Sequence, residues 1–151
     1  MKVAILSGSV YGAAEEVARH VKQLLGDASY EVFFNPRARL ADIQAFAPDA
    51  FLAVTSTTGM GELPDNLMPL YSEIRDVLPA AWRGLPGAVI ALGDSSYGDT
   101  YCGGGQLLTE LFAELGLREV SPMLKLDASE SVTPESDCEI WVQDLINELG
   151  K

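Results

Sequence analysis

The sequence predicts a doubly wound α/β fold, because strand-like and helix-like segments alternate five times along its 151 residues. Most of the strand-like runs are apolar throughout rather than alternating, which is typical of a parallel sheet covered by helices on both faces. The stretches between them have the lengths of connections, and no linker or internal repeat divides the chain. We therefore expect a single domain over residues 1–151, with a ligand site at the carboxyl edge of the sheet.

The first part of the chain contributes three strands and two helices. Val3–Leu6, Val32–Phe34 and Ala50–Val54 are short runs of apolar, β-branched or aromatic residues, which favour strands. Between the first two, apolar residues recur at i, i+3, i+4 and i+7 from residue 14 to residue 25, and this is the period of an amphipathic helix. Ala38–Phe46 predicts a shorter helix before the third strand.

The second part of the chain continues the alternation. Leu67–Leu78 and Leu107–Leu115 have the apolar period of helices, and Ala88–Leu92 between them has the composition of a buried strand. A fifth strand is expected around residues 120–126, where a Ser-Pro pair interrupts an otherwise apolar segment.

The last helix has a recognisable start. Thr133 supplies a hydroxyl suited to an N-cap, and Pro134 fits the first helical position because that position needs no backbone N–H. This helix completes the alternation. Its expected apolar stripe consists of Ile140, Trp141, Leu145, Ile146 and Leu149.

The chain is strongly acidic. Ten Lys and Arg residues oppose 22 Asp and Glu residues, so the formal net charge is −12. This charge repels nucleic acids and anionic membranes and attracts proteins with basic patches. Cys102 and Cys138 form no metal-ligand spacing and are too few for a disulfide framework, and no apolar run is long enough to span a bilayer. We expect a monomeric cytoplasmic protein without nucleic-acid, membrane or metal partners.

The connection after the first strand has the features of an anion site. Its small residues allow close approach of the backbone, and it leads into a helix whose first N–H groups have no partner within the helix. No Lys or Arg occurs between Val3 and Glu16, so a phosphate would be held by neutral donors, unlike in a Walker site. A tight turn of Gly and Ser is the alternative interpretation. The connection consists of Ser7, Gly8, Ser9, Val10, Tyr11, Gly12, Ala13 and Ala14.

Two further connections leave the same edge of the predicted sheet. The second begins with four consecutive hydroxyl residues, Thr55–Thr58, and is suited to completing a phosphate and polyol shell. The third, residues 93–105, combines Tyr97 and Tyr101 with many glycines and offers an aromatic face to a flat heteroaromatic ligand. An ordinary polar connection and two packing tyrosines are the respective alternatives.

These residues together resemble a flavodoxin of the short-chain, MioC-like and YqcA-like branch. The resemblance covers essentially the whole chain. It depends on two separated motifs in the family's order, Thr55–Asn66 and Ala91–Tyr97 followed by Tyr101–Gly104, and also on Leu126–Glu130. It implies a five-stranded parallel sheet of order 2-1-3-4-5, a noncovalently bound FMN, and an electron carrier rather than an enzyme. The implied partners are a basic NADPH-dependent flavodoxin or ferredoxin reductase and acceptor redox enzymes.

The resemblance also implies where FMN would bind. The phosphate would lie on backbone N–H groups of residues 9–14 with the hydroxyls of Ser9 and Ser56, and the ring would lie between residues 58–62 and 93–102. Tyr97 would stack on the ring, and the backbone at Asp94 would address its pyrimidine edge. No catalytic residue is expected. The residues expected to contact FMN are Ser7, Ser9, Val10, Tyr11, Gly12, Ala13, Ala14, Ser56, Thr57, Thr58, Gly59, Met60, Gly61, Leu92, Gly93, Asp94, Tyr97, Tyr101 and Cys102.

The chain departs from the family pattern in three places. One is the third connection, which is about one residue longer than the close family pattern between Tyr97 and Cys102 and so leaves the placement of Tyr101 open. Val10, Tyr11 and Ala14 stand where many flavodoxins have hydroxyl residues, so the backbone of the phosphate loop must supply more of the donors. Thr58 stands where a second aromatic residue often covers the ring, which leaves that ring face to neighbouring residues of the second connection.

The acidic residues near the predicted site bear on redox potential and partner choice. One carboxylate at about 10 Å, at an effective dielectric constant of about 20, opposes reduction by roughly 1–2 kcal/mol, or roughly 40–90 mV for one electron. The resemblance further suggests that the Gly59–Met60 peptide flips to stabilise the flavin semiquinone, which glycine permits. The candidate carboxylates are Glu62, Asp65, Asp94 and Asp99 around the ring, and Glu62, Glu73 and Asp76 toward a partner.

Two other functions share this fold. A phosphoacceptor receiver needs carboxylates after the first and third strands to hold Mg²⁺, and this chain has Ser and Gly or Ser and Thr there. A small FMN-dependent NAD(P)H:quinone reductase stays open as the alternative, because it would use the same FMN loops. A chain of 151 residues leaves little room for a nicotinamide site, which favours the carrier.

Overall fold

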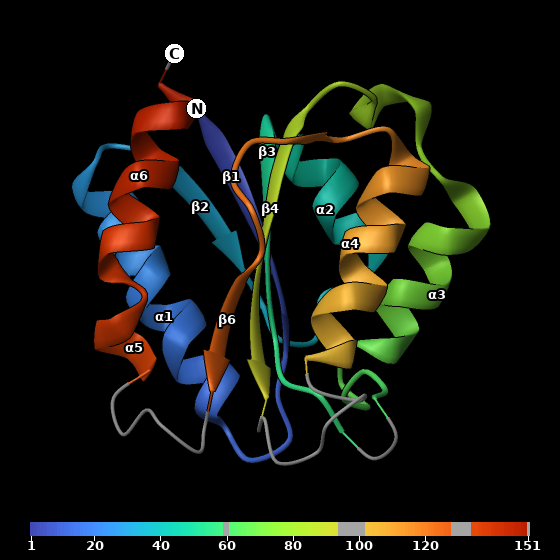
Figure 1. The fold of residues 1–151 in the computed structure, drawn as a ribbon. Helices are drawn as coiled ribbons and strands as arrows, with labels where there is room; N and C mark the ends of the chain where they lie inside the picture. The colour runs from blue at the N-terminus through green and yellow to red at the C-terminus, as the bar shows by residue number, and fades with distance from the viewer. Residues whose placement is uncertain (59–60, 94–101, 128–133, 151) are drawn as a thin grey trace.

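The computed structural model describes residues 1–58, 61–93, 102–127 and 134–150, and they form a parallel sheet between two layers of helices (Figure 1). The strand order is β2-β1-β3-β4-β5, with β6 also paired to β4, and every pairing is parallel. The prediction of a doubly wound sheet of order 2-1-3-4-5 is therefore confirmed. The strands are β1 (Lys2–Gly8), β2 (Glu31–Phe34), β3 (Ala50–Thr55), β4 (Pro86–Gly93), β5 (Arg118–Glu119) and β6 (Leu124–Asp127).

The fifth position of the sheet is divided between two short strands. β5 pairs with Pro86 and Gly87 at the start of β4, and β6 pairs with Ile90–Gly93 near its end. The Ser-Pro pair lies between them, as the sequence predicts, because proline has no N–H for a sheet ladder. The indole of Trp141 fixes this break by donating from Nε1 to the Pro122 carbonyl at 3.0 Å.

Helices cover both faces of the sheet, with α1, α5 and α6 on one side and α2, α3 and α4 on the other (Figure 1). Alternate residues of β1 enter the two cores, Val3 and Ile5 on the α1 side and Ala4 and Leu6 on the α3 side. Burial on both faces explains the continuous apolar strands. The helices are α1 (Ala13–Asp27), α2 (Leu40–Phe46), α3 (Met68–Val77), α4 (Gly103–Leu115), α5 (Pro134–Asp137) and α6 (Glu139–Leu149), with a 3₁₀ turn at Ala80–Trp82.

Two predictions about the helices are wrong in detail. Ile140 is 80% exposed although the sequence predicts it in the buried stripe of the last helix. Leu145 and Leu149 are buried as predicted, but the third buried residue of α6 is Val142. Ile140 lies about 200° around the helix from Val142 at about 100° per residue. In α4, the glycines 103–105 form the first turn of the helix rather than the end of the preceding loop.

Candidate cofactor-binding site

The carboxyl ends of β1, β3 and β4 meet at one edge of the sheet, which lies at the bottom of Figure 1. Gly8 is paired with Thr55, and Thr55 with Ala91, so the three connections that follow these strands leave at nearly the same level. The strand order reverses here between β1 and β3, because the chain goes to opposite sides of the sheet after these two strands. This is the position at which doubly wound sheets bind their ligands.

The amino terminus of α1 at this edge offers free backbone donors. Gly12 is the N-cap in a left-handed conformation, with φ 91°, and no side chain caps this end of α1. The first N–H of α1 with a partner in the helix is that of Glu16, which donates to Gly12 O at 2.9 Å. The N–H groups of Ala13, Ala14 and Glu15 therefore lack intrahelical partners and concentrate the positive end of the helix dipole.

The hydroxyl of Ser9 holds the shape of the loop before α1. Ser9 Oγ accepts a hydrogen bond from Gly12 N at 2.8 Å, which leaves the hydroxyl proton of Ser9 free to donate to a ligand. Val10 and Tyr11 are 46% and 97% exposed, so their side chains do not pack into the core.

Ser7, at the end of β1, has a buried hydroxyl without a partner among the described residues. The residue is 3% exposed, and the alternation along β1 puts its side chain on the α1 side of the sheet. An unpaired buried hydroxyl costs about 1–3 kcal/mol. This site is therefore suited to a water molecule or another polar group near the start of α1.

The second connection is anchored to both neighbours. Ser56 N donates to Gly8 O at 2.9 Å and Thr57 Oγ1 accepts from Gly104 N at 3.0 Å, which ties the connection to β1 and to the start of α4. Thr58 and Glu62 exchange two backbone hydrogen bonds of 2.9 and 2.8 Å. Gly59 and Met60, between them, lie outside the described residues, and so does the expected peptide flip.

Gly103 and Gly104 let this connection lie directly against α4. A Cβ on Gly103 would come within 2.7 Å of Gly61 O, and a Cβ on Gly104 would come within 2.5 Å of Ser56 O. Backbone therefore packs on backbone at both points. The sequence predicts these glycines in a ligand loop, whereas the structure gives them this packing role.

The third connection is described only at its two ends. Leu92 and Gly93 finish β4, and Leu92 is buried in the core that α1 covers. Cys102 is buried at the start of α4 with φ 55°, and its Sγ faces the carbonyl of Ala91 at 3.8 Å. Asp94, Tyr97 and Tyr101, the residues predicted to contact the flavin ring, and Asp99 lie outside the described part of the chain.

Comparison with known proteins decides the family. The model of the family described as Flavodoxin matches residues 5–141. The chain belongs to the flavodoxin family. An uncharacterized protein of Pseudomonas aeruginosa is 71% identical over 142 residues, and Flavodoxin YqcA of Escherichia coli K12 is 36% identical over 142 residues, in both cases 94% of each chain. A solved cysteine mutant of flavodoxin from P. aeruginosa has a TM-score of 0.96 at 67% identity over 100% of both chains.

Membership in the flavodoxin family confirms several predictions at once. The predicted branch is supported by Flavodoxin YqcA and by Protein MioC of E. coli K12, which is 31% identical over 97% of each chain. FMN is confirmed as the cofactor, and the general function is that of an FMN-binding electron carrier. In the part of this flavodoxin that the structure describes, no helix has the length and apolarity needed to cross a membrane.

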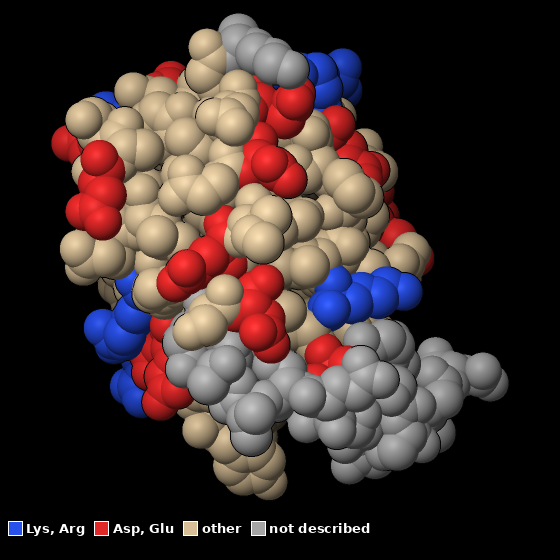
Figure 2. Space-filling view, turned by 60° about the vertical axis from the view of Figure 1, so that its left-hand side comes forward, with Lys and Arg blue, Asp and Glu red and all other residues tan. Residues whose placement is uncertain are grey.

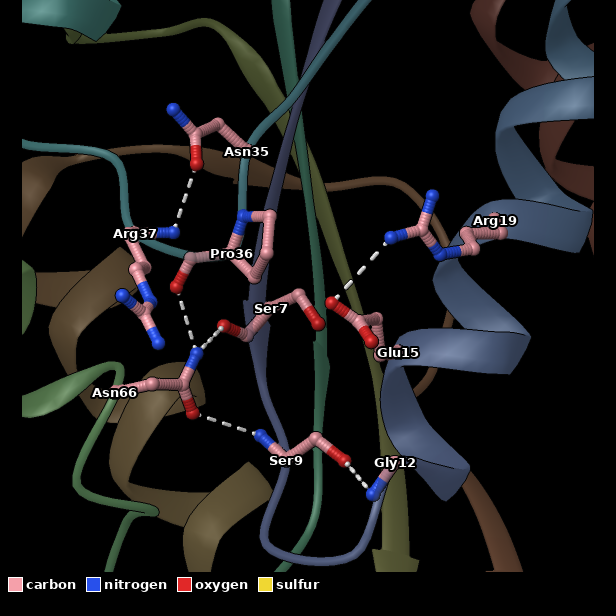
Figure 3. Close-up of polar contacts among 9 residues, drawn as sticks. All are labelled: Ser7, Ser9, Gly12, Glu15, Arg19, Asn35, Pro36, Arg37 and Asn66. Atoms are coloured by element: carbon pink, nitrogen blue, oxygen red, sulfur yellow. Dashed lines mark hydrogen bonds and ion pairs between the residues drawn. The ribbon is translucent and has the colours of Figure 1, made fainter.

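The described residues of this flavodoxin fit the phosphate of FMN. The loop before α1 has no cation, but it combines three helix N–H groups without intrahelical partners with the free proton of the Ser9 hydroxyl. Glu15 carries a negative charge in the same first turn, and its Oε1 lies 3.5 Å from Arg19 NH2, one turn further along α1 (Figure 3). This ion pair partly compensates one of the two carboxylates in the first turn of α1, those of Glu15 and Glu16.

The carboxylates predicted to attract a partner differ in their surroundings. Glu62 and Asp76 are both exposed at the surface. Glu73 accepts from Arg39 Nε at 2.7 Å and from Leu40 N at 3.3 Å, and the hydrogen bond from Arg39 is the main cause that lowers the pKa of Glu73. The charge of Glu73 is therefore partly compensated by the start of α2, and Glu73 contributes less to the attraction of a partner than the sequence suggests.

Sequence reasoning did not assign a role to Asn66, which lies just before α3. Its side-chain amide contacts three backbone atoms of two other connections at the site (Figure 3). An Asn directly before a helix usually indicates an N-cap. Here Leu67 is the N-cap and no side chain caps α3, so the local pattern gave no signal for the role of Asn66.

Proposed function

We propose that this flavodoxin carries single electrons between a basic NADPH-dependent flavodoxin or ferredoxin reductase and acceptor redox enzymes. Bound FMN supplies the redox chemistry, and the protein binds it, sets its potentials and exposes its edge. The observation that supports this proposal best is the cation-free amino terminus of α1, at the edge where three connections converge. A helix amino terminus binds phosphate through N–H groups and its dipole.

Different residues would bind the phosphate and the ring of FMN. The N–H groups of residues 10, 11, 13 and 14 and the hydroxyls of Ser9 and Ser56 would hold the phosphate, because the N–H groups of Ser9 and Gly12 already donate within the protein. Ser7, Thr57 and Thr58 lie at the same edge of the sheet. Gly61, at the end of the turn closed by Thr58 and Glu62, would lie beside the ring. On the sequence resemblance we assign stacking to Tyr97 and the pyrimidine edge to the backbone at Asp94.

A visible spectrum of the purified protein tests the proposal most directly. Flavin absorption should persist after desalting, and the supernatant after acid precipitation should contain FMN and no FAD. The proposed function is wrong if the apoprotein is folded, as measured by circular dichroism, and still stays colourless after incubation with excess FMN and desalting. Rapid oxidation of NADPH by the purified protein alone would instead favour the quinone reductase alternative.

The acidic surface supports a basic partner. Figure 2 shows Asp and Glu side chains across the face that carries α6, with Lys and Arg toward its edges, and the net charge is −12. Opposite charges accelerate encounter, and salt screens them. Reduction of the flavodoxin by a basic NADPH-dependent reductase should therefore slow as ionic strength rises, whereas rates independent of salt would contradict this partner class. A monomeric state and a cytoplasmic location stay predictions.

A further inference from the structure

The structure points to Asn66 as a residue that positions the phosphate loop, and we propose that it tunes the preference of this flavodoxin for FMN over riboflavin. Asn66 Nδ2 donates to Ser7 O at 3.0 Å and to Pro36 O at 2.7 Å. Its Oδ1 accepts from Ser9 N at 2.9 Å. The two carbonyls and the single N–H fix the orientation of the amide, and all three partners are backbone atoms (Figure 3).

The side chain of Asn66 makes the hydrogen bonds that a neighbouring strand would make to β1. In a parallel ladder, one residue of a neighbouring strand donates to the carbonyl of residue i and accepts from the N–H of residue i+2. Asn66 does the same to Ser7 and Ser9 with its side chain. Gly8 lies between them, and its carbonyl accepts a hydrogen bond from Ser56 N on the opposite side of β1. The amide of Asn66 therefore extends the ladder of β1 beyond its backbone partners.

The need for such a substitute follows from the path of β2. The pairing of β1 with β2 ends at Ile5 and Phe34, whereas its pairing with β3 continues to Gly8 and Thr55. The chain then turns away at Asn35 and Pro36, and proline has no N–H to donate. Asn66 fills the vacated side of β1 and also fixes the departing chain through the carbonyl of Pro36.

This contact links the two halves of the proposed FMN site. Ser9 begins the loop that would hold the phosphate, and its hydroxyl orients Gly12 N at the start of α1. Asn66 belongs to the connection that also contains residues 56–62, which would lie along the ribityl chain and ring. Loss of the amide should therefore disturb the phosphate end of the site first, because the direct contacts of Asn66 are to Ser7, Ser9 and Pro36.

The experiment compares FMN with riboflavin, which lacks the phosphate, and it rests on the proposed function. Flavin fluorescence quenching gives both dissociation constants for the full chain and for Asn66→Ala. We expect FMN affinity to fall about 10- to 100-fold, as for the loss of one to two net hydrogen bonds, and riboflavin affinity to change by less than about threefold. The matched control is Asn35→Ala, which removes one Asn contact, to Arg37 N at 2.9 Å, from the neighbouring turn. Its FMN affinity should stay within about twofold.

A second variant and a second measurement keep the test decisive. Asn66→Asp keeps the shape and the acceptor for Ser9 N but faces two carbonyls with a carboxylate, so it should lose FMN at least as strongly. If Asn66→Ala does not fold, Asn66→Asp carries the comparison. Amide hydrogen exchange of Ser9 should accelerate in Asn66→Ala, which lacks the acceptor, and much less in Asn66→Asp, which keeps it. This readout does not depend on any flavin.

The outcomes separate the inference from the proposed function. If the wild-type protein binds neither flavin, the proposed function fails, while protection of the Ser9 amide still tests the contact. If both flavins weaken equally in Asn66→Ala, or FMN binding is unchanged, Asn66 does not position the phosphate loop and the inference is overturned.

Discussion

The close contact between α4 and the second connection makes a quantitative prediction for Gly104→Ala. A Cβ at this position would lie 2.5 Å from Ser56 O and 3.3 Å from Thr57 Oγ1, and the Thr57 oxygen also accepts the N–H of residue 104. An ordinary contact begins near 3.4 Å, so Ser56 O or the helix must move by 3.4 − 2.5 = 0.9 Å. Such overpacking costs about 1–3 kcal/mol.

Gly26→Ala is the matched control for this substitution. Gly26 also lies in a helix, α1, and nothing lies within 4 Å of the position that a Cβ would take there. Replacing a helical glycine by alanine at an open site stabilises by about 0.5–1 kcal/mol. The same gain at residue 104 is offset by the overlap, so Gly104→Ala should be about 1–3 kcal/mol less stable than Gly26→Ala.

Urea unfolding of the two full-length variants measures this difference. Gly104→Ala should also weaken FMN binding, because the displaced Ser56 and Thr57 belong to the proposed site, whereas Gly26→Ala should leave FMN binding unchanged. Equal stabilities of the two variants, together with unchanged FMN affinity of Gly104→Ala, would refute the idea that backbone contact at α4 shapes the site.

Three further predictions concern the same edge of the sheet and its charges. Ser7→Ala should raise the free energy of unfolding of the apoprotein by about 1 kcal/mol, because it removes a buried hydroxyl without a described partner; a loss of stability in urea unfolding would show that the hydroxyl is paired. Arg39 lowers the pKa of Glu73, so this carboxylate stabilises the fold above its ordinary pKa of 4.5, and that contribution disappears as pH falls. Wild type should thus be more stable than Glu73→Gln at pH 7, and in acid denaturation experiments the difference should shrink below pH 4.5 and disappear as pH falls through the lowered pKa of Glu73. FMN binding should tighten a few-fold as NaCl increases, because the loop has no cation and salt screens the repulsion between the phosphate and a protein of net charge −12; a dissociation constant that rises with salt would contradict binding by neutral donors.

The spacing of apolar residues predicted most of the helices and strands, because each pattern lies within one segment of the sequence. The apolar stripe of α1 and the two-sided burial of β1 both follow from spacing along one segment. The failure at Ile140 has the same origin. Ile140, Trp141 and Val142 are consecutive apolar residues, so the sequence alone allows more than one stripe, and only packing against α1 and the sheet selects the one through Val142.

The sequence predicted the parts of the site that consist of backbone N–H groups in one segment. It did not predict contacts between residues that lie far apart in the sequence. The start of α1 was visible in the sequence, because small residues after a strand and before an amphipathic helix indicate free N–H groups. The packing of Gly104 on Ser56 joins positions 48 residues apart, and no local pattern records it. The same limit applies to Glu73, whose partner Arg39 lies 34 residues earlier in the chain.

Asn66 shows why a phosphate loop with few hydroxyls can still be ordered. A Lys or Arg side chain attracts phosphate through its charge even when its loop is mobile. Neutral N–H groups bind an anion well only when they already point at it, so the preorganisation of the loop matters more for them. The loop of this flavodoxin lacks hydroxyls at Val10 and Ala14, and it follows the last residues of β1, which are no longer paired with β2 beyond Ile5. A side-chain amide that replaces the missing ladder restores this support without adding charge. The order of the loop therefore depends on a residue 57 positions away from Ser9, and a search restricted to the loop itself would miss it.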